Sequence, residues 1–167
     1  LLADADQWYV FINYRVPRVL LAFIAGAGLS IAGMVFQSLF SNVLATPYTL
    51  GVSAAASFGT LFAFSTGVNF SIGIFNETVL FEIIFSFIAI LCIYLVSRRY
   101  ANGDISSVLL TGVAMNFFFS SLIMLMQFRL DYLNAFKFMH WLFGSIKNIS
   151  YEALIFQLTI FFISIVV

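Results

Sequence analysis

Charged residues are scarce in this sequence. Only 8% of the 167 residues are Asp, Glu, Lys or Arg, 63% are hydrophobic, and the formal net charge is +0. An average soluble domain is about 25% charged and about 45–50% apolar, so too little polar surface remains here to cover a water-soluble globule. The absence of net positive charge also argues against a nucleic-acid partner. The composition therefore predicts a polytopic membrane protein with lipid as its surroundings.

Residues that commonly carry chemistry are also few. The single cysteine, Cys92, lies in an apolar run and cannot form an intrachain disulfide, so we interpret it as a small hydrophobic residue. The single histidine, His140, stands beside Trp141 without spaced metal ligands, which indicates an interfacial residue rather than a metal or haem ligand. The P-loop pattern G-x-x-x-x-G-K-[ST] does not occur. We therefore expect no enzyme activity, no catalytic residue, no metal site and no cofactor bound by this chain.

Long apolar runs are what the sequence has in abundance. About 20 apolar residues in a helix span the hydrocarbon core of a bilayer. The runs predict an all-α bundle with about five transmembrane helices, at residues 16–40, 48–66, 78–96, 105–128 and 150–167, and an interfacial segment at about 130–147. The chain starts without Met and stops inside an apolar run, so we expect a partial transmembrane domain of a longer protein.

Small residues recur at intervals of four along the expected helices. The first helix carries such residues at Ala22, Gly26 and Ser30. The second carries a longer series, at Gly51, Ala55, Gly59, Ala63 and Gly67. Small residues four apart let helix backbones approach closely in lipid, so both series predict helix-packing faces rather than ligand sites.

Polar residues inside the apolar runs need partners. Gln37 lies near the end of the first helix, and it either bonds a neighbouring helix or lines a polar path. Glu82 lies about one turn inside the third helix, where its carboxylate reaches the headgroups or forms an intramembrane site. The fourth helix is the most polar, which is consistent with facing other helices or a water-filled path.

Two prolines mark the ends of the first helix. Pro17 suits a first helical turn, because its missing N–H would be unpaired there anyway. Between Ser41 and Pro47 the apolar run is broken, and Asn42 can bond its own backbone to hold a turn.

The Lys and Arg residues give a separate signal for orientation. If successive apolar runs cross the membrane alternately, the side with more Lys and Arg is predicted to be cytoplasmic, which would place Arg15 and Arg18 in the cytoplasm.

Five short elements, in order, resemble a family of transporters. Their residues are Arg15-Val16-Pro17-Arg18; Gly26, Leu29, Gly33 and Gln37; Asn42, Leu44, Ala45, Pro47, Leu50 and Gly51; Leu110, Gly112 and Ala114; and Trp141, Gly144 and Ser145. The chain is similar in these elements to the permease subunits of bacterial ABC importers for iron–siderophores, haem and vitamin B12, the iron-chelate/cobalamin permease family. Two departures affect the loop after the first helix: Ser41 replaces the usual Arg or other polar residue, and Val43 replaces the Pro after Asn42.

The resemblance implies a multi-pass protein of the bacterial inner membrane. Members have ten membrane helices and work as homodimers, so this segment would hold helices two to six beside a second permease subunit. ATP and Mg²⁺ would be bound by partner ATPase subunits in the cytoplasm. The resemblance places Arg15 and Arg18 outside, against the Lys/Arg count, where they would dock a periplasmic or lipid-anchored substrate-binding protein. The alternative for these arginines is that they reach lipid headgroups.

The resemblance also assigns roles along the transport path. It implies a cytoplasmic gate in the loop containing Asn42, Leu44, Ala45 and Pro47, and path-lining candidates at Gln37, Thr111, Met115 and Asn116. The segment from Pro47 to Gly51 is similar to the iron-chelate branch, which favours ferric siderophore as substrate. Haem or vitamin B12 import by the same family is the alternative. A secondary transporter or channel without an ATPase is a further alternative, although the intramembrane charge pairs frequent in that class are not visible.

Overall fold

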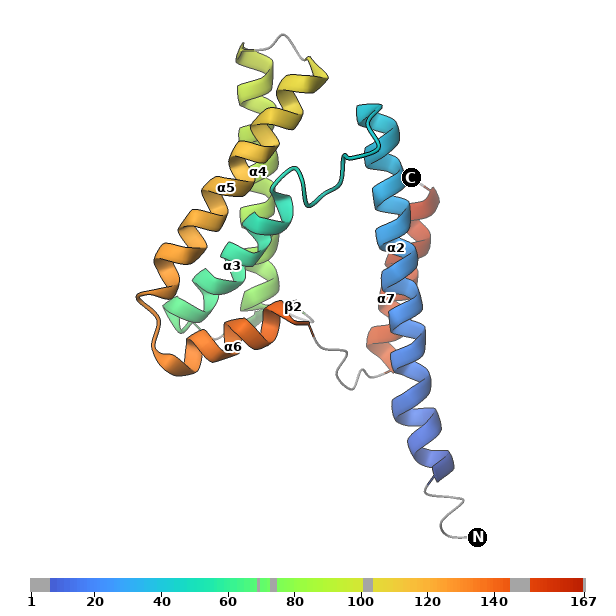
Figure 1. Ribbon diagram of the computed structural model, residues 1–167. Helices are drawn as coiled ribbons and strands as arrows, with labels where there is room; N and C mark the ends of the chain where they lie inside the picture. The colour runs from blue at the N-terminus through green and yellow to red at the C-terminus, as the bar shows by residue number, and fades with distance from the viewer. Residues whose placement is uncertain (1–6, 69, 73–74, 101–103, 145–150, 167) are drawn as a thin grey trace. The chain divides into compact units, whose positions relative to one another are not determined.

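The structure is a computed structural model that describes residues 7–68, 70–72, 75–100, 104–144 and 151–166 (Figure 1). Helices dominate it, as the apolar runs predict, and the all-α class is confirmed. The elements are the π-helical turn η1 (Phe11–Arg15), α2 (Val16–Phe40), α3 (Val52–Thr66), β1 (Ser71–Ile72), β2 (Phe75–Asn76), α4 (Glu77–Tyr100), α5 (Ile105–Gln127), α6 (Tyr132–Leu142) and α7 (Tyr151–Val166). The chain divides into two compact units, residues 1–32 with 144–167, and residues 33–143.

Three of the described helices are long and apolar enough to cross a membrane, namely Gln7–Phe40, Glu77–Arg99 and Ile105–Gln127. Two more described helices, Val52–Thr66 and Leu154–Ile163, are apolar but shorter. The apolar side chains of the three long helices are largely exposed, as in Phe23 of the first and Leu110 of the third, which are 73% and 72% accessible. A helix that is apolar on all sides suits lipid or further protein around it.

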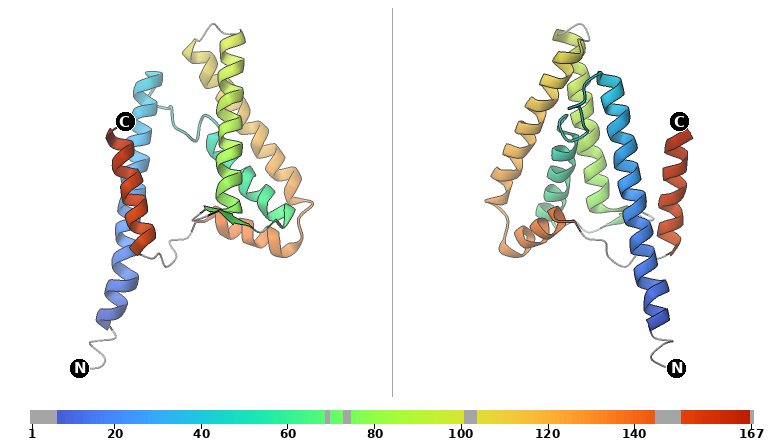
Figure 2. Two further views of the ribbon diagram at one scale, coloured as in Figure 1. Left: turned by 180° about the vertical axis from the view of Figure 1, so that it is seen from behind. Right: turned by 45° about the vertical axis from the view of Figure 1, so that its right-hand side comes forward.

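In the unit of residues 33–143, α3 lies between α4 and α5, and α6 crosses one end of α3 (Figures 1 and 2). Ala54 and Ala55 of α3 meet Ala89 of α4 and Phe119 of α5 in a buried cluster. Phe58 stacks edge-on against Phe85 with ring centroids 4.9 Å apart. Small residues in α3 thus bring the backbones together, and aromatic rings fill the space beside them.

The series of small residues on α3 has the expected packing role over most of its length. Gly51, Ala55, Gly59 and Ala63 are buried. A Cβ built on Gly59 would lie 2.5 Å from the Phe81 carbonyl oxygen of α4. Gly67 is different, because it is exposed and ends α3 in the left-handed conformation, with φ 63°.

Two of the expected helix bounds need correction. The second helix begins at Val52 instead of Tyr48, because Gly51 adopts a left-handed conformation with φ 73° and the residues before it form a turn. The third begins at Glu77 and continues past residue 96 to Tyr100. Glu77 in its first turn and Arg98 in its last both interact favourably with the helix dipole, so the charges extend the helix.

The expected interfacial segment at 130–147 contains a shorter helix, α6. It starts after Asp131, whose carboxylate accepts a hydrogen bond from Asn134 Nδ2 at 2.7 Å. Phe138 is fully buried and stacks on Trp141, with ring centroids 6.1 Å apart, while His140 is exposed. Gly144, with φ 71°, follows the helix end, and Ser145 lies outside the described residues.

In the other unit, helical structure begins before Val16 and runs through a π-turn. The Val16 N–H donates to the Phe11 carbonyl, five residues back. Pro17, expected in a first helical turn, therefore lies inside a helical stretch that already begins at Gln7. Pro17 has no N–H for the next carbonyl in this pattern, that of Ile12. The hydroxyl of Tyr151, at the start of α7, donates to the Ile12 carbonyl at 2.6 Å instead.

Candidate functional site

The loop after α2 is closed by a recurrent helix-ending pattern. Ser41 has φ 47°, the left-handed conformation that usually falls to glycine after a helix. The Asn42 N–H donates to the Gln37 carbonyl at 3.1 Å, and the Ser41 N–H to the Ser38 carbonyl at 3.3 Å. These two bonds are those of a Schellman motif, so the chain leaves α2 in a fixed direction.

Side chains hold the next peptide of this loop. The Gln37 amide donates through Nε2 to the Val43 carbonyl at 3.1 Å. Asn42 Oδ1 accepts the Leu44 N–H at 2.9 Å, which is the turn expected from its side chain. Val43 and Leu44 themselves are 79% and 75% exposed. The loop therefore presents two apolar side chains on a backbone held by polar ones.

The second half of the loop is anchored to the helices. Ala45 is only 1% exposed. Thr46 and Thr49 bond each other's backbone, with the Thr46 N–H on Thr49 Oγ1 at 2.9 Å and the Thr49 N–H on Thr46 Oγ1 at 3.1 Å. Leu50 is buried, and a Cβ built on Gly112 of α5 would lie 2.9 Å from the Leu50 Cα. Backbone contact with α5 thus fixes the end of the loop.

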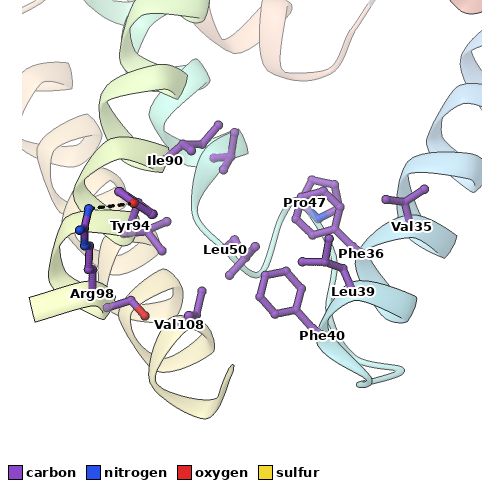
Figure 3. Close-up of a pocket in the computed structure, with 13 residues that line it drawn as sticks. Val35, Phe36, Leu39, Phe40, Pro47, Leu50, Ile90, Tyr94, Arg98 and Val108 are labelled. Carbon is purple, nitrogen blue, oxygen red and sulfur yellow. Dashed lines mark hydrogen bonds between the residues drawn. The ribbon is translucent and has the colours of Figure 1, made fainter. Parts of the chain in front are cut away.

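A cavity of about 1020 Å³ lies beside this loop, between the end of α2, α4 and the start of α5 (Figure 3). Its lining is mainly apolar, with Phe40 and Leu50 toward the middle of the view. Arg98 borders it and donates through its guanidinium to the Tyr94 hydroxyl at 3.2 Å. Pro47, one of the expected gate residues, also lines the cavity.

The path candidates of α5 lie near α3 and the loop. Thr111 donates its hydroxyl to the Ser107 carbonyl of its own helix at 2.8 Å. Met115 packs against the buried cluster of α3, α4 and α5. The backbone N of Asn116 would lie 2.6 Å from a Cβ on Gly51. The fourth candidate, Gln37, contacts the loop, and a path-lining role for all four stays a prediction.

The docking candidates Arg15 and Arg18 lie at the junction of η1 and α2. Both are exposed, whereas Pro17 between them is buried. Three positions apart on a helix, two side chains lie on neighbouring parts of one face. The geometry therefore presents two cations on one side of an otherwise apolar helix.

The sequence did not identify the partner of Glu82. Thr60 of α3, which is fully buried, donates its hydroxyl to Glu82 Oε1 at 2.6 Å. The spacing of Gly59 and its neighbours predicts which face of α3 packs against another helix. Which residue of that helix lies opposite Thr60 depends on how α3 and α4 pack, and the structure shows that it is Glu82. Glu82 thus bonds a helix of its own chain and links α3 to α4.

Comparison with known families gives a match over the whole chain. The family model described as the FecCD transport family matches residues 1–167. An uncharacterised ABC transporter permease protein of Bacillus subtilis, YvrB, is 37% identical over 164 residues, which cover 96% of this chain and 46% of that protein. The chain therefore spans about half the length of the curated relatives that it matches.

Other relatives carry names that state a cargo. The molybdate import system permease protein MolB of Haemophilus influenzae is 32% identical, over 92% of this chain and 44% of its own length. The hemin transport system permease protein HmuU of Yersinia pestis is 27% identical, over 89% of this chain and 45% of its own length. A solved structure described as an inward-facing metal-chelate type ABC transporter aligns with TM-score 0.80 and 30% identity, covering 96% of this chain and 49% of that one.

Proposed function

Since the chain belongs to the FecCD transport family, a family of multi-pass inner-membrane proteins, we propose that it is part of the permease subunit of an ABC importer. The permease would move its cargo by alternating access, driven by ATP and Mg²⁺ on separate ATPase subunits, as one half of a permease dimer. The family match carries this proposal. The arrangement of the loop after α2 supports it, because an ordered loop with an apolar tip suits a gate.

Within this importer, the loop after α2 would close the cytoplasmic end of the path. Leu44 is the gate residue with the most exposed side chain among the four candidates. Asn42 would shape the turn, and Ala45 and Pro47 would connect it to the helices. A side chain that protrudes from a rigid turn can obstruct a path without being part of the bundle core.

Arg15 and Arg18 would receive acidic residues of the substrate-binding protein on the outer side. Opposite charges steer encounter and fix the register of two proteins. The exposure of both side chains, on one part of the helix, supports this role. Positive residues outside also run against the usual orientation signal, and a docking role gives them a reason.

The variant in which Arg15→Glu and Arg18→Glu are combined tests docking. We expect binding of the substrate-binding protein to fall by at least about tenfold, because two like charges now face its acidic residues. Surface plasmon resonance on the full-length transporter measures this, and membrane insertion should be unchanged. A control with Arg98→Glu and Arg99→Glu makes the same charge change in the last turn of a different helix, α4. Unaltered binding in the Arg15/Arg18 variant removes the docking role.

As substrate we propose a ferric siderophore, on the likeness of Pro47-Tyr48-Thr49-Leu50-Gly51 to the iron-chelate branch. Relatives are named for hemin, molybdate and vitamin B12, so the family itself spans several cargoes. Growth on defined iron sources separates ferric siderophore from haem, in a strain that lacks its own importer and is supplied with the full-length gene, its ATPase and its binding protein. Growth on haem but not on siderophores would mean that the substrate is haem instead of a ferric siderophore. Transport without any copurifying ATPase would contradict the ABC mechanism and favour a secondary transporter or channel.

A further inference from the structure

One peptide group in the loop after α2 is held from both ends. Its carbonyl, that of Val43, accepts the Gln37 side-chain amide at 3.1 Å. Its N–H, that of Leu44, donates to Asn42 Oδ1 at 2.9 Å. A planar peptide that is bonded at both its oxygen and its nitrogen cannot rotate without breaking one of these bonds. The orientation of this peptide decides the directions in which the Val43 and Leu44 side chains leave the backbone.

Gln37 contributes to the loop twice. Its own carbonyl accepts the Asn42 N–H at 3.1 Å, which closes the Schellman motif, and its side chain then reaches the Val43 carbonyl six residues along the chain. Because Gln37 belongs to the last turns of α2, its side chain transmits the position of the helix end to the loop tip. Asn42 acts from within the loop and carries no such connection.

We propose that Gln37 is a positioning residue for the cytoplasmic gate. By holding the Val43–Leu44 peptide, together with Asn42, it keeps the apolar tip in the arrangement that closes the path and couples that tip to α2. This inference rests on the proposed gate function of the loop. Gln37 need not touch the cargo, so it differs from a path-lining residue.

The way in which the start and the end of the loop are held supports the positioning role of Gln37. The threonine pair at Thr46 and Thr49 fixes the end of the loop near α3, and the Schellman motif fixes its start. Between them, the Val43–Leu44 peptide is bonded by side chains at both its carbonyl and its N–H. With 79% and 75% of their surfaces exposed, Val43 and Leu44 have little packing to hold them, so the two side-chain bonds carry the order of the tip.

The experiment uses the complete transporter, with its ATPase, in proteoliposomes loaded with radiolabelled ferrioxamine B. Gln37→Leu removes the amide with little change in size, and Gln37→Glu keeps the shape but offers no donor when ionised. We expect both variants to raise ATP-independent efflux of the probe about fivefold, the factor that corresponds to one lost hydrogen bond. Ser38→Ala, one residue further along, is the matched control and should leave efflux unchanged.

A spin label at Leu44, introduced as Leu44→Cys, gives a second readout that does not depend on transport. In the Gln37→Leu background its spectrum should show higher mobility, and Asn42→Ala should have the same effect. Because both residues hold one peptide, the effect of the double variant should be smaller than the sum of the two single effects. Additive effects, or unchanged label mobility in Gln37→Leu and Gln37→Glu, would overturn the inference.

Leu44→Ala separates this inference from the proposed function. Raised efflux in Leu44→Ala supports the loop as a gate. If Leu44→Ala leaks and the two Gln37 variants do not, the gate stands and the positioning role of Gln37 fails. If Leu44→Ala does not leak either, the proposed gate itself fails.

Discussion

Two helices in this chain carry small residues at the same spacing, yet their surroundings differ. On α3, a Cβ at Gly59 would meet the Phe81 carbonyl oxygen at 2.5 Å. On α2, a Cβ at Gly26 would have nothing within 4 Å among the described residues. Small-residue spacing therefore shows where a helix can be approached closely, but not whether this segment provides the neighbour.

The largest effect should come from the start of the series on α3. Gly51→Ala combines a left-handed φ of 73° with a Cβ 2.6 Å from the Asn116 backbone N. Left-handed strain costs about 1–2 kcal/mol and overpacking about 1–3 kcal/mol more. We expect the variant to unfold at a markedly lower temperature, measured by differential scanning fluorimetry in detergent.

Gly67→Ala is the matched control for that variant. Gly67 is also left-handed, with φ 63°, but a Cβ there has open space. The free energy of unfolding of Gly67→Ala should therefore fall only by the cost of the left-handed backbone, about 1–2 kcal/mol. Equal destabilisation of the two variants would mean that the contact between Gly51 and α5 has no energetic weight.

The next effect compares the two helices directly. Gly59→Ala should destabilise by about 1–3 kcal/mol, because its Cβ collides with backbone atoms of α4 that cannot move aside easily. Gly26→Ala should be neutral or stabilise by up to about 1 kcal/mol in this segment, since alanine favours a helix over glycine. Denaturation in mixed micelles measures both.

The same pair can be repeated in the full-length protein. A tolerated Gly26→Ala there means that the face of α2 remains open, whereas a destabilised one means that another helix covers it. If Gly59→Ala were tolerated in either form, the close approach of α3 to α4 would be wrong.

The smallest effect concerns the bond between Thr60 and Glu82. Thr60→Val keeps the shape but removes the donor. Hydrogen bonds between membrane helices average about 0.6 kcal/mol, with a maximum of about 1.7 kcal/mol. We expect a loss in this range, measured by the same denaturation. Thr60→Ser retains the hydroxyl and should keep most of the stability. A loss in Thr60→Ser as large as that in Thr60→Val would mean that the bond to Glu82 contributes no more than the packing of the methyl group that serine lacks.

Much of the fold could be predicted because lipid imposes simple constraints on sequence. The expected end of the first helix, at residue 40, coincides with the end of α2, and residues 105–128 differ from α5 by one position. Apolar length and absence of charge determine these bounds. The start of α3 could not be predicted in this way, because an apolar Tyr48 fits a helix equally well. Only the backbone conformation of Gly51 decides it.

The site was harder to predict for a related reason. Asn42 has a short side chain that bonds locally, so its turn could be inferred from the residue type. Gln37 has a longer side chain, and the sequence left open whether it bonds a helix or lines a path. Its observed partner, the Val43 carbonyl, depends on the direction in which the chain leaves α2, and that direction depends on a left-handed Ser41.

The hydrogen bond from Tyr151 to the Ile12 carbonyl has a consequence for biosynthesis. Its two residues are 139 positions apart, so the acceptor is synthesised and inserted well before its donor. Until α7 arrives, the carbonyl left without a helical donor by Pro17 must remain near water or headgroups. We therefore expect the segment that contains Ile12 to stay shallow or mobile in the insertion machinery, and to reach its final depth only after α7 has entered the bilayer.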